Sequence, residues 1–364
     1  MTRVAMTGGD GFLGWHVQCA LREQRIVAGD IPVGSFFDAD QARRAMEGAG
    51  RFIHLAGVNR GTDEEVAAGN ILFAEQAAGV LRTVDNPPSV VVYANSIQST
   101  LDNIYGKAKA AASEILRAAA NAVGAEFIDV SFPNLFGEHG RPFYNSVVAT
   151  FCHILAESGA PTVIEDRELT LLHAQDAADL LIGNVPIEAM EGLTALETVT
   201  GLRDRLASMA SCYSRGEIPD ISARFDRDLF NTYRSYAPTL TTGIPLTPHS
   251  DDRGTFFEIM RAGGGQNQSS FSVTKPGFRR GDHFHRRKIE RFIVLAGQAT
   301  MTLRKVGTDQ RVFIDVTGDQ PVAVDMPTMW THAITNTGNE PLYTAFWINE
   351  LYDPAHPDTT PEVA

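Results

Sequence analysis

The chain has 364 residues, which is long enough to form two domains that each bury a core of their own. Hydrophobic residues make up 43% of the sequence and charged residues 21%, proportions that are typical of globular proteins. The formal net charge of -13 argues against a nucleic-acid partner, because binding a duplex requires Lys and Arg to displace counterions. An anionic small ligand is not excluded, since a few local donors can hold a phosphate inside an acidic protein.

The three cysteines, Cys19, Cys152 and Cys212, have neither the number nor the spacing of a disulfide framework or a thiolate zinc site. The first residues run directly into a strand-like segment, without the pattern of a signal peptide. No apolar run approaches the roughly 18 residues that a membrane span requires. We therefore expect a reduced, cytoplasmic protein that does not cross a membrane.

Strands and helices are predicted to alternate through the first half of the chain. The predicted strands cover residues 3–7, 25–30, 51–56, 89–95 and 126–131. The predicted helices cover residues 12–23, 39–47, 64–81 and 107–122. This alternation is typical of an α/β Rossmann-type fold, a doubly wound parallel sheet that helices cover on both faces.

The pattern changes near residue 240. Residues 236–250 are rich in Pro, Thr and Gly, which predicts a linker. Short predicted strands separated by glycine turns follow it, at residues 256–260, 270–274, 291–295, 300–304, 311–316 and 342–349. We expect a second, all-β domain of the jelly-roll type, with the first domain spanning residues 1–243 and the second residues 244–364.

A glycine-rich turn connects the first predicted strand to the first predicted helix. Gly8, Gly11 and Gly14 lie three residues apart, where glycines let the backbone turn tightly and approach a pyrophosphate at the helix N-terminus. This position in a βαβ unit predicts a pyridine-dinucleotide site. Asp30, at the end of the second strand, can bond the adenosine ribose hydroxyls, which favours NADH; the alternative is a solvated turn aspartate.

Tyr105 and Lys109 lie four residues apart, on one face of a helix that begins near them. A nearby ammonium is expected to lower the pKa of the phenol, so that the pair can exchange a proton with a carbonyl that undergoes hydride transfer. Ser96, at the carboxyl end of a predicted parallel strand, can bond the same oxygen. These three residues are the predicted catalytic group.

Together with the motifs at residues 54–60 and 133–137, these residues resemble the extended short-chain dehydrogenase/reductase family. The resemblance implies that Tyr105 is the acid/base, that Lys109 also holds the nicotinamide ribose, and that Ser96 orients the substrate. The family often has an arginine where this chain has Ser131, so one contact differs. Implied cofactor contacts are Gly8, Gly11, Phe12, Leu13, Gly14, Asp30, Leu55, Ala56, Gly57, Asn70 and Lys109, and implied substrate contacts are Gln98 and Asn134.

The most specific pattern of the chain is a histidine–glutamate cluster. His283 and His285 lie two apart on a predicted strand and therefore on one face, and Glu290 follows on the next strand. With His332 from a later strand, they form a ligand set that suits Zn²⁺ or a similar divalent ion with an open coordination position. Two alternatives stay open, namely strand histidines without a metal, and acid/base work by His283 and Glu290 without a metal.

The segment from Gly277 to Gly297 fits the first cupin motif, G-x5-HxH-x4-E-x6-G, at every fixed position. The second cupin motif is only partly present, because Met329 stands where a glycine is usual. This resemblance implies a metal-binding β-barrel with the four ligands named above.

Both halves together resemble the CapF family, which fuses a nucleotide-sugar reductase to a cupin epimerase. The matching segments are 52–60, 96–105, 133–137, 144–152, 168–176, 228–236, 251–254 and 349–359. The family implies that the cupin inverts C3 of a UDP-linked 4-keto-6-deoxy-N-acetylhexosamine and that the reductase then reduces C4. It also implies a homodimer and NADPH, whereas Asp30 favours NADH, so the cofactor is NADPH or NADH.

Three other functions remain open at this stage. The first alternative to the bifunctional enzyme is a monofunctional 4-ketoreductase whose cupin domain serves only dimerisation. A nucleotide-sugar sensor without turnover is disfavoured, because Tyr105, Lys109 and Ser96 are all present. A metal-dependent dioxygenase is compatible with the chemistry of the histidine cluster alone.

Overall fold

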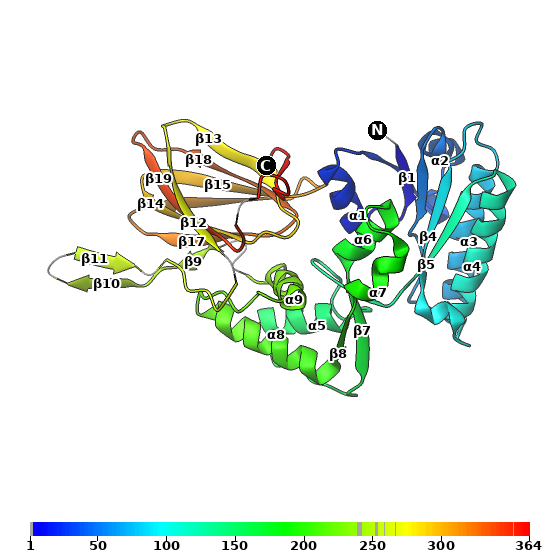
Figure 1. The fold of residues 1–364 in the computed structure, drawn as a ribbon, viewed down its shortest axis with the longest axis horizontal. Helices are drawn as coiled ribbons and strands as arrows, with labels where there is room; N and C mark the ends of the chain where they lie inside the picture. Colours follow the sequence, from blue (N-terminus) through cyan, green and yellow to red (C-terminus); the bar gives the residue numbers. More distant parts are fainter. Residues whose placement is uncertain (1–2, 239–241, 252–253, 258, 266, 352) are drawn as a thin grey trace. The chain divides into compact units, whose positions relative to one another are not determined.

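The computed structural model describes residues 3–238, 242–251, 254–257, 259–265, 267–351 and 353–364, without the side chains of residues 248–257. The chain forms two compact units, and each consists of two segments (Figure 1). The first unit comprises Met1–Leu135 and Thr170–Leu196, and the second comprises Phe136–Leu169 and Glu197–Ala364.

A five-stranded parallel sheet forms the centre of the first unit, which confirms the predicted α/β fold. Its strand order is β2-β1-β3-β4-β5. This order reverses direction between β1 and β3, and such switch points are where doubly wound sheets bind ligands. The strands are β1 (Val4–Thr7), β2 (Ala28–Ile31), β3 (Arg51–His54), β4 (Val90–Ser96) and β5 (Glu126–Phe132).

Helices cover both faces of this sheet, because alternate strand residues point to opposite sides. Val91 and Tyr93 pack in the core beneath α2 (Ala39–Met46), α3 (Asp63–Leu81) and α4 (Ile104–Ala122). Val92 and Ala94 pack in the opposite core, beneath α1 (Phe12–Glu23) and α6 (Ala174–Ile182). The near-continuous apolar run of β4 is thus explained by burial on both faces.

The starts of one strand and one helix differ from the sequence prediction by three residues, while most other ends shift by two at most. The second strand begins at Ala28 and not at residue 25, because Arg25 has φ 59° and turns the chain at the end of α1. Helix α4 begins at Ile104 and not at residue 107, because the Asn103 side chain caps it by accepting a hydrogen bond from Gly106 N at 2.7 Å. This earlier start places Tyr105 in the first turn of the helix.

Two five-stranded antiparallel sheets pack face to face in the second unit, which confirms the predicted all-β second part (Figure 1). The first sheet has the order β12 (Gln268–Thr274), β19 (Leu342–Ile348), β14 (Glu290–Ala296), β17 (Val322–Met326) and β9 (Ile244–Pro245). The second has the order β16 (Arg311–Thr317), β15 (Gln298–Lys305), β18 (Trp330–Asn336), β13 (Arg279–Phe284) and β20 (Thr360–Pro361). Both sheets contribute apolar side chains to one core, including Met301, Val324 and Leu342.

The remaining elements are short or helical. Helices α5 (Val147–Ala156), α8 (Val199–Ser214) and α9 (Arg224–Arg234) belong to the second unit, and α7 (Met190–Leu193) belongs to the first. The chain passes between the units within β6 (Asn134–Phe136), near the start of β7 (Glu168–His173) and within β8 (Ala195–Thr198). A hairpin of β10 (Pro248–Asp251) and β11 (Gly254–Phe257) follows β9.

The linker and strand predictions of the second half are only partly tested. Residues 239–241 of the expected linker and residue 258 of the expected strand 256–260 lie outside the described residues. Part of the expected linker is ordered, because Ile244 and Pro245 pair with β17, a strand that the sequence analysis missed. The other five predicted strands are confirmed as β12, β14, β15, β16 and β19, with ends shifted by a few residues at most.

A buried ion pair attaches helix α8 to the first β-sheet within the second unit. Arg291 on β14 contacts Asp325 on β17 at 2.7 Å, and Tyr213 on α8 donates a hydrogen bond to Asp325 at 2.6 Å. Arg291 also donates to the carbonyl oxygen of Gly216 at 2.5 Å. The second compact unit therefore includes residues that precede position 243, where the sequence predicts the end of the first domain. The predicted boundary between residues 243 and 244 stays a prediction.

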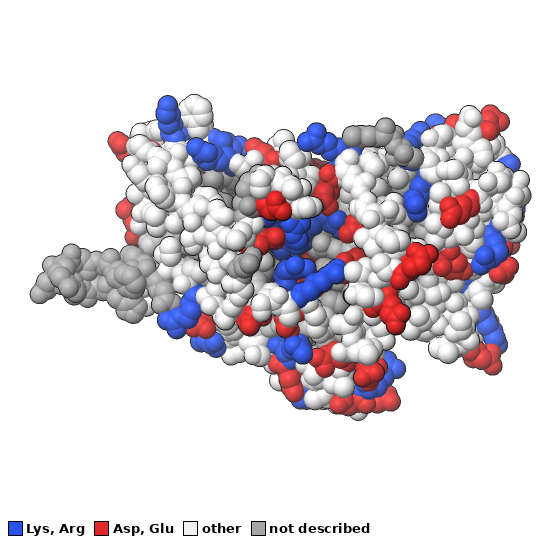
Figure 2. Space-filling view, viewed as in Figure 1, with Lys and Arg blue, Asp and Glu red and all other residues white. Residues whose placement is uncertain are grey.

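Acidic and basic side chains are interspersed over the face that Figure 2 shows. Among the residues that the structure describes, no helix combines the length and the apolar character needed to cross a bilayer.

The buried imidazole of His54 makes the stability of the first unit depend on pH. His54 is fully buried at the end of β3, and burial together with the nearby Lys109 lowers its pKa to about 3. Unfolded histidine has a pKa near 6.5, so between about pH 6.5 and 3 the unfolded state binds a proton that the folded state does not. The stability that the neutral ring contributes is therefore lost as the pH falls through this window.

We expect His54→Asn to flatten the pH dependence of the unfolding free energy between pH 6.5 and 3. The difference in slope between wild type and variant should approach about 1.4 kcal/mol per pH unit, the value for one proton. Denaturant titrations at several pH values measure it, with His356→Asn at an exposed histidine as the control. Equal slopes for wild type and His54→Asn would contradict a neutral His54.

Candidate functional site

The glycine loop lies at the carboxyl end of β1, beside the switch point of the parallel sheet. Gly8 has φ +71°, and a Cβ added to it would lie 2.8 Å from the backbone nitrogen of Ala56. A Cβ on Gly14 would lie 2.0 Å from the carbonyl oxygen of Gly8. Glycine is therefore required at both positions by backbone contacts, and the approach to a pyrophosphate that the sequence predicts stays a prediction.

The N-terminus of α1 is suited to an anion. Gly11 is its N-cap residue and provides no side-chain acceptor for the first-turn amides, and no acidic residue lies in the first turn. Phe12 and Leu13, which begin the helix, are half-buried. Free amide groups and the positive end of the helix dipole together fit a pyrophosphate, so these residues fit the dinucleotide that the sequence predicts.

Asp30 lies beside the glycine loop, although 16 or more residues separate it from Gly8, Gly11 and Gly14 in the sequence. A Cβ on Gly9 would lie 2.8 Å from its Oδ1 atom, and its carboxylate accepts a hydrogen bond from the Gly9 amide. Partial burial and the neighbouring Asp10 raise its pKa. This position fits the predicted ribose contact, which remains a prediction.

The loop after β3 faces the glycine loop across the switch point. Thr7 holds it, because its hydroxyl oxygen accepts hydrogen bonds from Leu55 N and Ala56 N, each at 3.2 Å. Asn70 donates to Val58 O at 2.6 Å, and a Cβ on Gly57 would lie 2.8 Å from Asn70 Oδ1. The structure thus brings Leu55, Ala56, Gly57 and Asn70 together beside the loop.

Asn70 Oδ1 is a buried acceptor without a hydrogen-bond partner in the described part of the chain. The sequence analysis missed Thr7, whose hydroxyl orders this loop. A polar residue at the end of an otherwise apolar strand, directly before the glycine loop, is the signal that could have identified it.

The predicted catalytic residues meet at the carboxyl end of β4. Ser96 is the last residue of this strand, and its side chain lies near enough to the phenol of Tyr105, in the first turn of α4, to affect the pKa of that phenol. Lys109, one turn further along α4, is buried and donates to Ala94 O at 2.7 Å. Its ammonium lies 4.3 Å from the centre of the Tyr93 ring. The structure thus brings Ser96, Tyr105 and Lys109 together at this edge of the sheet.

The predicted effect of Lys109 on Tyr105 is wrong for this structure. Burial raises the pKa of Tyr105, and the hydrogen bond from Ser96 opposes this only in part. Burial also lowers the pKa of Lys109 to about 7, against the attraction of Asp129. The ammonium is engaged by Ala94 O and the Tyr93 ring, which explains why it does not favour a phenolate at Tyr105.

The two predicted substrate residues are both exposed. Gln98 lies in a short 3-10 helix, Ile97–Thr100, that follows β4. Asn134, at the start of β6, donates to Thr170 O at 3.2 Å. Their contact with a substrate stays a prediction.

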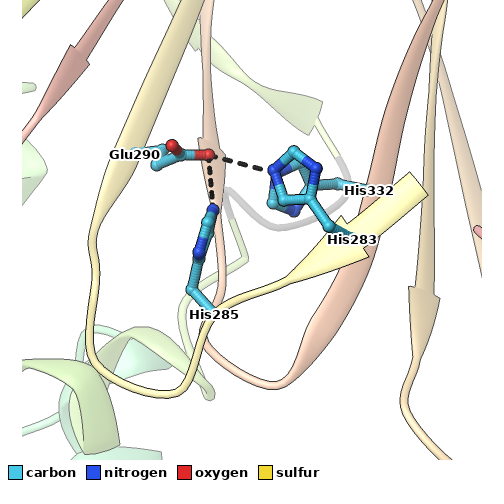
Figure 3. Close-up of side chains that lie close together, drawn as sticks. All are labelled: His283, His285, Glu290 and His332. Carbon is cyan, nitrogen blue, oxygen red and sulfur yellow. Dashed lines mark ion pairs between the residues drawn. The ribbon is translucent and has the colours of Figure 1, made fainter. Parts of the chain in front are cut away.

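The histidine–glutamate cluster forms between the two β-sheets (Figure 3). His283 and His332 face each other from the paired strands β13 and β18, with ring centres 4.6 Å apart. Glu290, the first residue of β14, lies 3.1 Å from a ring nitrogen of both His285 and His332. The four possible ligand atoms all lie within 4.8 Å of one another, so the structure brings the predicted set together.

His285 lies just beyond β13, although the sequence predicts both histidines within one strand. The register of β13 shifts between Gly281 and His283, and Asp282 has φ 57°. The strand ends at Phe284. The two rings still converge, with centres 4.9 Å apart, because the chain turns toward Glu290 after the strand.

The donor atoms fit a divalent cation. His285 Nδ1 pairs with the carbonyl oxygen of Asp358, and His332 Nδ1 lies 3.3 Å from Trp330 O. Such outer contacts direct the other ring nitrogen toward a metal. The atoms His285 Nε2, Glu290 Oε2 and His332 Nε2 are buried and, in the described residues, contact no polar partner except one another.

Burial disfavours charge in the cluster, but the ion pairs dominate for Glu290. The imidazoles of His285 and His332 hold the pKa of Glu290 well below its usual value against the cost of burial, and Glu290 raises the pKa of His285 in turn. Burial and the two neighbouring rings lower the pKa of His283 to about 4. The carboxylate of Glu290 and the neutral ring of His283 have the charge states that a metal requires of its ligands, whereas a metal would displace the proton that Glu290 favours on His285.

The structure accommodates methionine where the second cupin motif usually has glycine. Met329 has φ 59°, in the left-handed region that favours glycine, and its side chain is fully buried. Its amide donates to His285 O at 2.6 Å. The turn before His332 is therefore retained and is tied to the loop that carries His285.

Family models match both parts of the chain. Residues 4–183 match the NAD dependent epimerase/dehydratase family. Residues 249–360 match the polysaccharide biosynthesis C-terminal domain.

Full-length relatives exist among curated proteins and solved structures. A UDP-2-acetamido-2,6-beta-L-arabino-hexul-4-ose reductase from Pseudomonas aeruginosa is 30% identical, and the match covers 98% of this chain and 97% of the relative. The crystal structure of the capsular polysaccharide assembling protein CapF from Staphylococcus aureus is 31% identical, with a TM-score of 0.61. That match covers 99% of this chain and all of CapF. A second crystal form of CapF matches with 26% identity and a TM-score of 0.54.

We expect Gly14→Ala to impair both folding and dinucleotide binding, because its methyl group would overlap the Gly8 carbonyl oxygen. The unfolding free energy should fall by about 1–3 kcal/mol, as for other overpacked sites. Gly79→Ala is the matched control, since Gly79 is exposed in α3 and a Cβ there meets nothing within 4 Å. It should stabilise the chain by about 0.5–1 kcal/mol and leave NADH and NADPH titrations unchanged. A Gly14→Ala variant with wild-type binding would contradict the role of the loop.

We expect Zn²⁺ to raise the melting temperature of the wild type and a chelator to lower it. At a free concentration of about 100 times its Kd, a ligand stabilises the folded state by about 2.7 kcal/mol. His332→Ala should abolish the shift, while His356→Ala, at an exposed histidine, should retain it. Identical zinc shifts in both variants would argue against a metal in the cluster.

Proposed function

We propose a function for this chain from the premise that it belongs to the CapF family, in which an epimerase/dehydratase-type domain precedes a polysaccharide biosynthesis C-terminal domain. The proposed enzyme reduces the C4 ketone of a UDP-linked 4-keto-6-deoxy-N-acetylhexosamine with NADH or NADPH. Its C-terminal cupin domain epimerises C3 of the same sugar. The Pseudomonas relative, a UDP-2-acetamido-2,6-beta-L-arabino-hexul-4-ose reductase, supports this substrate class.

The Ser96–Tyr105 pair is the observation that carries the reductase proposal. It lies at the carboxyl edge of the parallel sheet, at the end of β4. The neighbouring strand β3 leads into the loop that faces the glycine turn. A bound dinucleotide supplies the hydride that reduces C4. Because burial raises its pKa, Tyr105 is a neutral phenol that can donate its proton to the C4 oxygen, while Ser96 orients that oxygen.

The second reaction is assigned to the cluster of His283, His285, Glu290 and His332. We place a divalent cation, with zinc as the leading candidate, on these side chains. When bound, it supplies positive charge that makes the carbon acid next to a ketone easier to ionise. His283 is the least buried of the four, which makes it the candidate to stay off the cation and remove the C3 proton, while solvent returns a proton to the opposite face.

The chemistry fixes the order of the two steps. A C3 proton is acidic only while C4 is a ketone, because the carbonyl delocalises the resulting charge. Reduction of C4 removes this acidity. Epimerisation therefore precedes reduction, and one chain carries a site for each step.

A second candidate is a monofunctional 4-ketoreductase whose β-domain serves only to form a homodimer. An apolar strip on the edge of the first β-sheet favours it. Phe271, Val273 and Tyr343 are 72%, 42% and 43% exposed, and Val273 and Tyr343 are cross-strand neighbours. Exposed apolar side chains on a sheet face are typical of association surfaces.

We expect opposite defects from two variants that are assayed with a UDP-linked 4-keto-6-deoxy-N-acetylhexosamine. Tyr105→Phe should abolish NAD(P)H consumption, because it lacks the donated proton, and should retain deuterium exchange at C3 in heavy water. His283→Ala should lose C3 exchange and retain reduction of a substrate that already has the epimerised configuration. Absorbance at 340 nm and mass spectrometry measure the two reactions.

The same assays separate the alternatives. Loss of both reactions in both variants would contradict the division of labour. A wild type that consumes NAD(P)H but shows no C3 exchange, with or without added zinc, would select the monofunctional reductase.

A further inference from the structure

The C-terminal segment Asp358–Ala364 returns to the histidine–glutamate cluster. Its strand β20 pairs with β13, so that Pro361 lies opposite His283 and Thr360 opposite Phe284. Glu362 N donates to Asp282 O at 2.9 Å, which continues the pairing. The strand that carries His283 is therefore held on one edge by the end of the chain.

Asp358 binds the loop that separates two of the cluster residues. Its carboxylate accepts hydrogen bonds from the backbone amides of Arg286 at 2.9 Å, Arg287 at 3.0 Å and Lys288 at 2.9 Å. This loop connects His285 to Glu290. Three amide contacts to one buried carboxylate fix the path of the loop and hence the separation of the two side chains.

The backbone of Asp358 makes a second contact, because its carbonyl oxygen pairs with His285 Nδ1. Asp358 adopts φ 41°, in the left-handed region, and in this conformation both its carbonyl and its carboxylate reach the loop. A contact at Nδ1 leaves Nε2 of the ring for the centre of the cluster. One residue thus fixes the loop and the orientation of a ring on it.

The negative charge of Asp358 also reduces the repulsion between a bound cation and the basic side chains of the loop. Arg286, Arg287 and Lys288 place three consecutive cationic side chains between His285 and Glu290. A divalent cation in the cluster would be repelled by these charges. Asp358 is the carboxylate nearest to their backbone, and it lies 3.9 Å from the Arg287 guanidinium, so it offsets part of this repulsion.

We propose that Asp358 is a positioning residue for the cation site, and that the C-terminal segment is an integral part of that site. The proposal rests on the metal-binding function proposed above. Asp358 contacts the loop and the His285 ring, and it acts on the cation through them.

The test measures zinc affinity of the full chain by competition with a chromophoric chelator. Asp358→Ala should weaken zinc binding by about 10- to 100-fold, the usual effect of losing a residue that orients a metal ligand. Asp358→Asn should weaken it less, because its amide oxygen still accepts a hydrogen bond. The control is Asp353→Asn, an exposed carboxylate shortly before this segment whose partners among the described residues are Ala355 N and His356, and it should bind zinc like the wild type.

Amide hydrogen exchange provides a readout that does not depend on the metal. The amides of Arg286, Arg287 and Lys288 should exchange faster in both Asp358 variants, while those of β15 should not change if the fold is intact. If the wild type binds no zinc, both the proposed metal site and the role of Asp358 in it fail, whereas zinc binding by the wild type without a loss in Asp358→Ala overturns only the role of Asp358. Wild-type zinc affinity together with wild-type exchange in Asp358→Ala would overturn the proposal, as would an equal loss of affinity in Asp353→Asn.

Discussion

The buried carboxylate of Glu290 requires polar partners, because it lies between two apolar sheets, and the arrangement of the cluster in the second unit depends on this requirement. Two imidazole nitrogens lie 3.1 Å from it, and each belongs to a histidine whose other nitrogen is held by a backbone carbonyl. The polar atoms at the centre of the cluster are thus aimed at one another by the surrounding backbone. Such an arrangement is costly without a ligand and is satisfied by a cation.

The first unit rests on a different constraint, which is the close approach of backbone segments. At Gly8 and Gly14 the neighbouring backbone leaves no room for a side chain, so the start of α1 lies directly against the loop after β3. This packing exposes the amides of α1 at the switch point of the sheet. The Ser96–Tyr105 pair lies at the end of β4, next to β3 in that sheet, and this proximity is what a hydride-transfer site requires.

Both sites use residues whose electrostatic state depends on burial more than on sequence neighbours. The pKa of Tyr105 is raised although a lysine lies four residues away, because Lys109 is engaged by Ala94 O and the Tyr93 ring. The pKa values of Glu290 and His285 move toward the charged pair in spite of burial. A phenol that keeps its proton suits a reductive step, and a charged carboxylate suits metal binding.

The sequence by itself determined the fold of each half and predicted most of the residues that the structure brings together at the two candidate sites, because glycine spacing, the Tyr–Lys interval and the HxH pattern are local consequences of turn, helix and strand geometry. Only the tertiary structure decided that Thr7 orders the loop after β3 and that Asp358 returns from the end of the chain to hold the loop beside His285. It also decided the direction of the pKa shift of Tyr105. These features depend on contacts between segments far apart in the chain and on burial, which no local pattern encodes.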